Sequence, residues 1–207
     1  MKVVGLTGGI CSGKTTVCEF IKEKEGCRVV NADLLGHQTY LPGTETYHKI
    51  LEAFKHETEE ESLVNSTDNT INRKVLGGIV FSSPEKMNRL TDIVWPAIKE
   101  LAVKEMGKAK EEGIVLFVLE AAILLEAGWE DAVDEVWLLC CEEEVALHRL
   151  MARNGLSEEE ALKRIRSQMS NEEKKARAHV VIDGGQPVEQ VKASVASELS
   201  RICGSSS

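Results

Sequence analysis

A glycine-rich segment near the N-terminus has the residue types and spacing that bind a phosphate chain. Four residues separate Gly8 from Gly13, and Lys14 and Thr15 follow directly. Glycines let backbone N–H groups turn toward a phosphate, the lysine can reach the β- and γ-phosphates, and the threonine hydroxyl can hold Mg²⁺. The pattern predicts a nucleoside triphosphate site, with a glycine-rich turn that holds no ligand as the alternative. The predicted loop consists of Gly8, Gly9, Ile10, Cys11, Ser12, Gly13, Lys14, Thr15 and Thr16.

The phosphate loop indicates a ligand but not a reaction, since kinases share it with nucleotide-dependent switches and motors. The N-K-x-D sequence typical of a GTPase is absent from the chain. A kinase needs a carboxylate near the acceptor hydroxyl and arginines that neutralise the phosphoryl group in transfer. The chain offers both kinds of residue, so a kinase is the favoured interpretation.

The carboxylate candidate is Asp33, which ends the apolar segment CRVVNAD. Ligands in open α/β sheets lie beyond the carboxyl ends of the strands. We therefore expect Asp33 to face the phosphate loop and to act as general base or orienting group for the acceptor hydroxyl. The alternative is that Asp33 caps the helix that follows.

Arginines gather in residues 147–177 of this acidic chain. Arg149 and Arg153 are four residues apart on one predicted helical face, and an Asn-Gly turn and a new helix with a Ser-x-x-Glu capping box follow. This pattern is typical of a helical lid that closes over phosphates. For Arg164 and Arg166 a solvated helix face is an equally good interpretation.

Short apolar runs alternate with longer amphipathic ones, which predicts an α/β fold with a parallel sheet and flanking helices. Helices are expected at 14–24 and around 98–109, with Pro96 kinking or starting the second. Residues 34–113 form a gap too long for a simple crossover and predict an inserted helical region. The acidic stretch 55–70 within it is expected to be a solvated loop. Strands are expected at 3–7, 28–31, 114–119, 135–140 and 179–182.

Composition and charge argue against several classes of protein, among them membrane-spanning and nucleic-acid-binding proteins. The 207 residues predict one compact domain over 1–203 with a flexible tail at 204–207, and they do not indicate an oligomeric state. A net charge of −9 argues against a nucleic-acid or anionic membrane surface. No apolar run reaches the ~18 residues of a membrane span, and no signal peptide is recognised, so a cytoplasmic protein is expected. The six cysteines show no metal-ligand or disulfide pattern, although Cys11 would lie near a helix N-terminus.

Several segments together resemble the dephospho-CoA kinase family, over about residues 3–200. They are GLTGGICSGKTT, NADLLGHQTYLPG, INRKVLGGIVF, VLEAAILLEAGW, LHRLMARNGLSEEEALKRI and AHVVIDGG, in the order and spacing of that family. The details LGH, LTDIVWP and AAILLEAGW resemble most the kinase domain of the bifunctional CoA synthase of animals. No adenylyltransferase half is present in these residues, so a stand-alone enzyme and an excised domain are both open.

The resemblance implies a P-loop kinase core with an inserted helical CoA subdomain and a lid. It also implies ATP-dependent phosphorylation of the ribose 3'-hydroxyl of dephospho-CoA to give CoA and ADP, the last step of CoA synthesis. Asp33, Lys14 and Arg149 would then be catalytic, Arg153 would bind ATP, and Thr15 would hold Mg²⁺. The acceptor side would be lined by Asp33, His37, Tyr40, Arg73, Leu124, Leu125 and Glu126.

Several positions depart from the pattern of bacterial members of the family, and three of them bear on ligand contacts. Glu120 stands where an Asp is usual, which leaves its part in holding Mg²⁺ through water open. His179 and Gly184 replace an Asp and an Asn, so adenine contacts are expected from the backbone of 184–187. Two other functions are compatible with the chain: a P-loop kinase for a nucleoside monophosphate or a sugar acid, and a nucleotide-binding regulatory module without catalysis.

Overall fold

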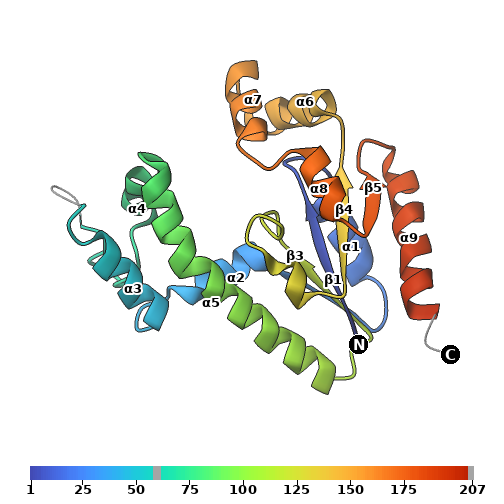
Figure 1. Ribbon diagram of the computed structural model, residues 1–207, viewed down its shortest axis with the longest axis horizontal. Helices are drawn as coiled ribbons and strands as arrows, with labels where there is room; N and C mark the ends of the chain where they lie inside the picture. The colour runs from blue at the N-terminus through green and yellow to red at the C-terminus, as the bar shows by residue number, and fades with distance from the viewer. Residues whose placement is uncertain (58–61, 205–207) are drawn as a thin grey trace. The chain divides into compact units, whose positions relative to one another are not determined.

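A computed structural model describes residues 1–57 and 62–204 of the chain (Figure 1). The chain divides into two compact units. The first, here called the sheet unit, is Met1–Asn31 with Glu105–Ser207, and the second, here called the helical unit, is Ala32–Lys104.

The sheet unit is built on parallel strands in the order β2-β3-β1-β4-β5. Because all neighbouring strands run in the same direction, their carboxyl ends meet at one edge, where ligands of open α/β sheets bind. Every predicted strand is found, each within two residues of its predicted ends, and the predicted α/β fold is confirmed. The strands are β1 (Lys2–Gly8), β2 (Cys27–Asn31), β3 (Leu116–Glu120), β4 (Glu135–Cys140) and β5 (Val180–Asp183).

Different elements cover the two faces of this sheet (Figure 1). Val17 of α1 and Val195 of α9 are fully buried in one core with side chains of β1, β3 and β4. On the other face α8 lies against β4, and Leu124 of the segment after β3 packs against Gly5. The helices of the sheet unit are α1 (Lys14–Lys22), η1 (Trp129–Ala132), α6 (Glu143–Asn154), α7 (Glu158–Arg166), α8 (Asn171–Arg177) and α9 (Val188–Gly204).

The ends of α6, α7 and α8 are set by local signals in the sequence. Gly155 ends α6 in the left-handed conformation with φ of 64°, a region that favours glycine. Ser157 begins α7 with the predicted capping box. A second capping box, Ser170 with Glu173, begins α8 and was not predicted. The order helix, turn, helix expected in the lid segment is therefore present.

The helical unit contains α2 (Ala32–Thr39), α3 (Glu45–Phe54), α4 (Arg73–Phe81) and most of α5 (Pro84–Glu111). Its core gathers apolar side chains of α3, α4 and α5 and of the segment between α3 and α4. The expectation that Pro96 starts a helix is wrong, because α5 begins at Pro84 and runs through it. An internal proline removes one backbone hydrogen bond, and the burial of Ile98 and Ala102 beyond it offsets that cost.

The acidic stretch 55–70 is only partly a solvated loop. Residues 58–61 lie outside the described residues. Beyond them Leu63 is 6% exposed and belongs to the core of the helical unit, and Val64 bridges to Ile71 in antiparallel fashion. The buried leucine holds this part of the stretch against the helices. None of the helices in residues 1–57 and 62–204 combines the length and apolar character that crossing a membrane requires.

Candidate functional site

The phosphate loop joins β1 to α1 in the sheet unit. Gly13 precedes α1 with φ of 100°, and Cys11 has φ of 58°, so the loop takes a left-handed backbone conformation at two positions. The Lys14 ammonium group donates to the carbonyl oxygens of Gly8 at 2.8 Å and of Gly9 at 3.0 Å. Lys14 therefore lies over the first limb of the loop, from Gly8 to Ile10.

Close packing on both sides shapes this loop. A Cβ atom on Gly8 would lie 2.2 Å from the carbonyl oxygen of Leu139 in β4 and 2.6 Å from Oγ of Ser12. A Cβ atom on Gly184 would lie 1.9 Å from the carbonyl oxygen of Ser12. Glycine at these two positions lets β4 and the turn after β5 approach the loop backbone.

Arg149 joins the loop to the turn after β5. Its Nη1 group donates to the carbonyl oxygens of Cys11 at 3.2 Å and of Gly184 at 2.8 Å. In the same turn, hydrogen bonds from the Gln186 side chain and the Gly185 N–H, together with the charge of Arg149, lower the pKa of Asp183. The ionised Asp183 carboxylate holds this turn in place.

A cavity of about 410 Å³, here called the nucleotide cavity, opens along the loop. It brings residues 11–16 of the loop together with both predicted lid arginines, Arg149 and Arg153. It also includes Gln186, Val188 and Val191, which the sequence did not indicate individually. Only the expectation of backbone contacts at 184–187 pointed to this region. The lining residues are Cys11, Ser12, Gly13, Lys14, Thr15, Thr16, Arg149, Arg153, Gly184, Gln186, Val188 and Val191.

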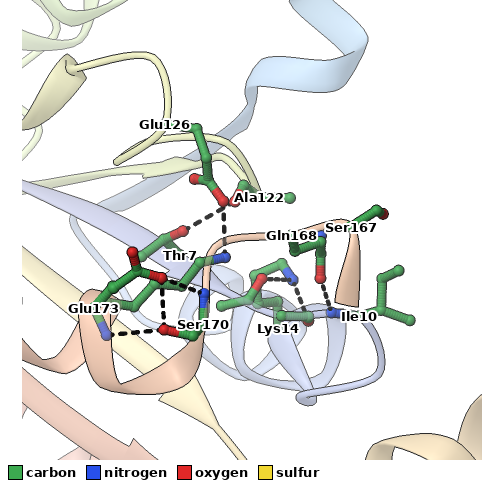
Figure 2. Close-up of polar contacts among 12 residues, drawn as sticks. Thr7, Ile10, Lys14, Ala122, Glu126, Ser167, Gln168, Ser170 and Glu173 are labelled. Carbon is green, nitrogen blue, oxygen red and sulfur yellow. Dashed lines mark hydrogen bonds and ion pairs between the residues drawn. The ribbon is translucent and has the colours of Figure 1, made fainter. Parts of the chain in front are cut away.

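A side chain from the turn between α7 and α8 reaches the first limb of the loop. Figure 2 shows Gln168 beside Ile10, and Oε1 of Gln168 accepts a hydrogen bond from the Ile10 N–H at 2.8 Å. No motif in the sequence identifies Gln168 as a site residue. Gln168 follows α6 and α7 in the sequence, so its contact with the loop depends on how these helices fold back.

The segment after β3 does not present the predicted leucines to a cavity. Leu124 and Leu125 are 0% and 1% exposed, and Leu124 lies against Gly5 of β1. Glu126 instead forms an ion pair with Lys174, with Oε1 3.1 Å from Nζ, and Lys174 is fully buried. Burial of these leucines in the core was not expected, and their predicted place on a substrate cleft stays a prediction.

Glu120, at the end of β3, is held by its neighbours in the sheet unit. Its Oε2 atom accepts a hydrogen bond from Nδ2 of Asn31 at 2.8 Å. Cys18 of α1 lies beside it, and burial followed by the nearby Glu120 charge raises the pKa of that thiol to about 12. Cys18 is therefore a neutral core thiol at physiological pH.

The helical unit holds four of the predicted acceptor residues, Asp33, His37, Tyr40 and Arg73, and two of its cavities share His37 and Tyr40. One of about 330 Å³, here called the Arg73 cavity, includes Arg73, whose guanidinium group lies 5.7 Å from the centre of the Tyr40 ring. The other, of about 350 Å³ and here called the Trp95 cavity, is lined by Asp33, Gly36, His37, Tyr40, Leu76, Leu90, Thr91, Val94, Trp95 and Ile98.

Asp33 lies in the first turn of α2, two residues after the end of β2. Its side chain is exposed, and within the described residues no hydrogen bond or ion pair of its carboxylate is found. The alternative that Asp33 caps α2 thus gains no support. That Asp33 faces the phosphate loop stays a prediction.

Comparison with known proteins identifies the family. A sequence profile described as dephospho-CoA kinase matches residues 2–189. The chain belongs to the dephospho-CoA kinase family. It is 41% identical to a protein named dephospho-CoA kinase from Geobacter sulfurreducens, over 93% of this chain and 94% of that protein. It is also similar to a solved Thermus thermophilus structure, with 30% identity, a TM-score of 0.78 and 97% of both chains covered. A solved dephospho-CoA kinase from Campylobacter jejuni is 25% identical with a TM-score of 0.63, again over 97% of both chains.

Membership in the dephospho-CoA kinase family confirms the predicted family, its P-loop kinase fold and the use of ATP by a phosphotransferase. The roles of individual site residues and the binding of Mg²⁺ stay predictions. So does the closer likeness to the kinase domain of the animal CoA synthase, because the relatives compared above are bacterial.

Proposed function

We propose that this chain transfers the γ-phosphoryl group of ATP to the 3'-hydroxyl of the ribose of dephospho-CoA, giving CoA and ADP. The phosphate loop carries this proposal, with Lys14 over its first limb and Arg149 bridging it to the turn after β5, in a chain of the dephospho-CoA kinase family. The bond from the γ-phosphorus to the β,γ-bridging oxygen breaks, and a bond from that phosphorus to the ribose oxygen forms. The hydroxyl proton leaves to a carboxylate.

The phosphate loop has the donors that this transfer needs. Backbone N–H groups of the loop and the N-terminus of α1 favour anionic oxygens. The Lys14 ammonium group would exchange the carbonyl oxygens of Gly8 and Gly9 for phosphate oxygens. Arg149 and Arg153 line the nucleotide cavity and add positive charge where negative charge develops.

The threonine after the lysine fits Mg²⁺. The Thr15 side chain is exposed at the nucleotide cavity, and its hydroxyl has no hydrogen-bond partner among the described residues. The described residues contain no group of three His, Cys, Asp or Glu side chains that could hold a metal ion, so the ion would depend on Thr15 and on the phosphates. Mg²⁺ would neutralise charge on the phosphates during transfer.

The acceptor is assigned to the helical unit. Asp33 would accept the proton of the ribose hydroxyl, since its carboxylate is exposed and has no hydrogen bond or ion pair in residues 1–57 and 62–204. Arg73 and His37 would contact the diphosphate of dephospho-CoA in the Arg73 cavity. The Trp95 cavity is largely apolar and suits the uncharged arm of this substrate.

The first experiment measures ADP release by the full chain with Mg²⁺-ATP and one of dephospho-CoA, AMP, shikimate, gluconate or no acceptor. Turnover that depends on dephospho-CoA alone is the expected result. Turnover with another acceptor would indicate a different small-acceptor kinase. No acceptor-dependent turnover would indicate a nucleotide-binding module.

The role of Asp33 is tested by Asp33→Asn, with Asp92→Asn as the matched control on an exposed residue of the same unit. We expect kcat to fall by about 10²–10⁴-fold in Asp33→Asn with unchanged ATP affinity, because a general base contributes that much. The control should keep wild-type constants. Full turnover in Asp33→Asn would refute the assignment.

The cytoplasmic location expected from the sequence stays a prediction.

A further inference from the structure

The Gln168 side chain makes one hydrogen bond with the phosphate loop, and this bond involves only the oxygen of its amide. Its Oε1 atom accepts the hydrogen bond from the Ile10 N–H at 2.8 Å (Figure 2). A backbone N–H is a donor, so the oxygen and not the nitrogen of the amide must face the loop. Within the described residues the Gln168 NH₂ group has no partner. Two N–H donors next to the loop therefore lack an acceptor in the part of the chain that the structure describes.

The position of Lys14 shows which end of the nucleotide this amide would meet. The Lys14 ammonium group lies on the carbonyl groups of Gly8 and Gly9, and Gln168 binds the next residue, Ile10. Figure 2 shows Lys14, Ile10 and Gln168 side by side. The lysine of a phosphate loop reaches the β- and γ-phosphates. The first limb of the loop is thus the end where the terminal phosphate lies.

A second cavity gives this amide room to meet a ligand. It measures about 660 Å³ and includes Gly9, Ile10, Ser12 and Gln168. Ser12 also lines the nucleotide cavity, so both cavities lie against the loop. Two of the acidic side chains of this cavity, Glu143 and Glu172, are paired with Arg166 and Lys175, which reduces their repulsion of an anion.

The turn that carries Gln168 is anchored by the residues that follow it. Nδ2 of Asn171 donates to the carbonyl oxygen of Cys141 at 2.9 Å, and Ser170 and Glu173 form the capping box of α8 (Figure 2). Lys174 is fully buried, and a buried ammonium group is costly unless it is paired, as it is here with Glu126. These contacts hold Gln168 in place before a ligand arrives, as a preorganised donor requires.

We propose that Gln168 is a further nucleotide-binding residue, which holds the Ile10 N–H through Oε1 and donates from Nε2 to an oxygen of the terminal phosphate. The proposal rests on the proposed kinase function, in which that phosphate is the transferred group. ADP lacks the terminal phosphate. The Gln168 amide therefore distinguishes ATP from ADP.

The test measures affinities for the non-hydrolysable imido analogue of ATP and for ADP, both with Mg²⁺, by calorimetry on the full chain. Gln168→Ala is expected to weaken binding of the analogue by about 10- to 100-fold, since hydrogen bonds to charged groups contribute that much, and to change ADP affinity by less than about threefold. Gln168→Glu keeps an acceptor for the Ile10 N–H but loses the donor and adds negative charge, so it should bind the analogue more weakly than Gln168→Ala does. Gln190→Glu makes the same charge change on an exposed residue of α9 and should bind both nucleotides as the wild type does.

Three results would overturn the proposal. Equal weakening for both nucleotides would mean that Gln168 only shapes the loop. Wild-type affinities in Gln168→Glu would mean that the acceptor alone matters. Unchanged affinities in both variants would remove the role altogether. Because no phosphoryl acceptor is present, these results do not depend on whether dephospho-CoA is the acceptor, and thermal midpoints close to that of the wild type show that the variants fold.

Discussion

Replacing Gly8 by alanine tests whether the phosphate loop depends on close packing against β4. The added Cβ atom would lie 2.2 Å from the carbonyl oxygen of Leu139, directly opposite Gly8 in the β1–β4 register. Both atoms belong to rigid backbone segments, so no side-chain rotation relieves the overlap. The end of β1 and the loop must move by roughly 1 Å to reach an ordinary contact distance.

The size of the effect follows from that displacement. A misplacement of about 1 Å at a reacting group can cost ~10²-fold in rate. Overpacking of this kind also costs about 1–3 kcal/mol of stability, which is about 2–12 °C in Tm for a chain of this size. We therefore expect Gly8→Ala to fold with a lower Tm and to lose about 100-fold in kcat/KM for ATP.

The assay is ADP release at varied ATP concentration with dephospho-CoA in excess, with Tm from thermal unfolding. Gly107→Ala is the matched control, because Gly107 lies inside α5 and a Cβ atom there meets nothing within 4 Å. The control should keep its kinetic constants and gain slightly in Tm, since alanine favours a helix over glycine by about 0.5–1 kcal/mol. Wild-type kcat/KM and Tm in Gly8→Ala would refute the packing argument.

Further predictions concern the arginine network, a buried thiol and a salt bridge. Arg149→Lys should raise the KM for ATP by about 10-fold in the same assay, because lysine cannot reproduce the planar guanidinium contacts to two backbone carbonyl groups. Burial raises the pKa of Cys18 to about 12, so a thiol reagent at pH 8 should label exposed Cys203 in the native protein and Cys18 only after unfolding, as peptide mapping would show. Hydrogen bonds from Arg201 lower the pKa of Glu135 from 4.5 to about 2, so the stability from this pair is fully present above pH 4.5 and lost as the pH falls toward 2. Denaturant unfolding should therefore show Glu135→Gln to be less stable than the wild type at pH 7, with the difference becoming small as the pH falls to 2.

The strands and the lid helices could be predicted because their signals are local. A strand of a buried parallel sheet is a short apolar run, and β4 was placed at both ends from its composition alone. The capping box at Ser157 likewise marks the first residues of α7. Pro96 shows where local signals fail, since burial along α5 outweighs the intrinsic tendency of proline to end a helix. Leu63 shows the same limit. It lies in an acidic stretch of the sequence, yet its side chain is buried in the core of the helical unit.

The sequence by itself determined the ligand class and the family of this protein. Phosphate binding by the loop depends on consecutive residues, whose glycines and lysine are sufficient to specify the chemistry. Only the tertiary structure decided which distant groups complete the site. Gln168 reaches Ile10 across 158 positions of the chain, and Arg149 reaches Cys11 across 138. Such contacts depend on how helices pack against the sheet, and side-chain packing over long sequence separations leaves no fixed spacing to recognise. The burial of Leu124 and Leu125 was decided in the same way, because an apolar pair after a strand is compatible with a cleft or a core until the opposite face of the sheet is filled.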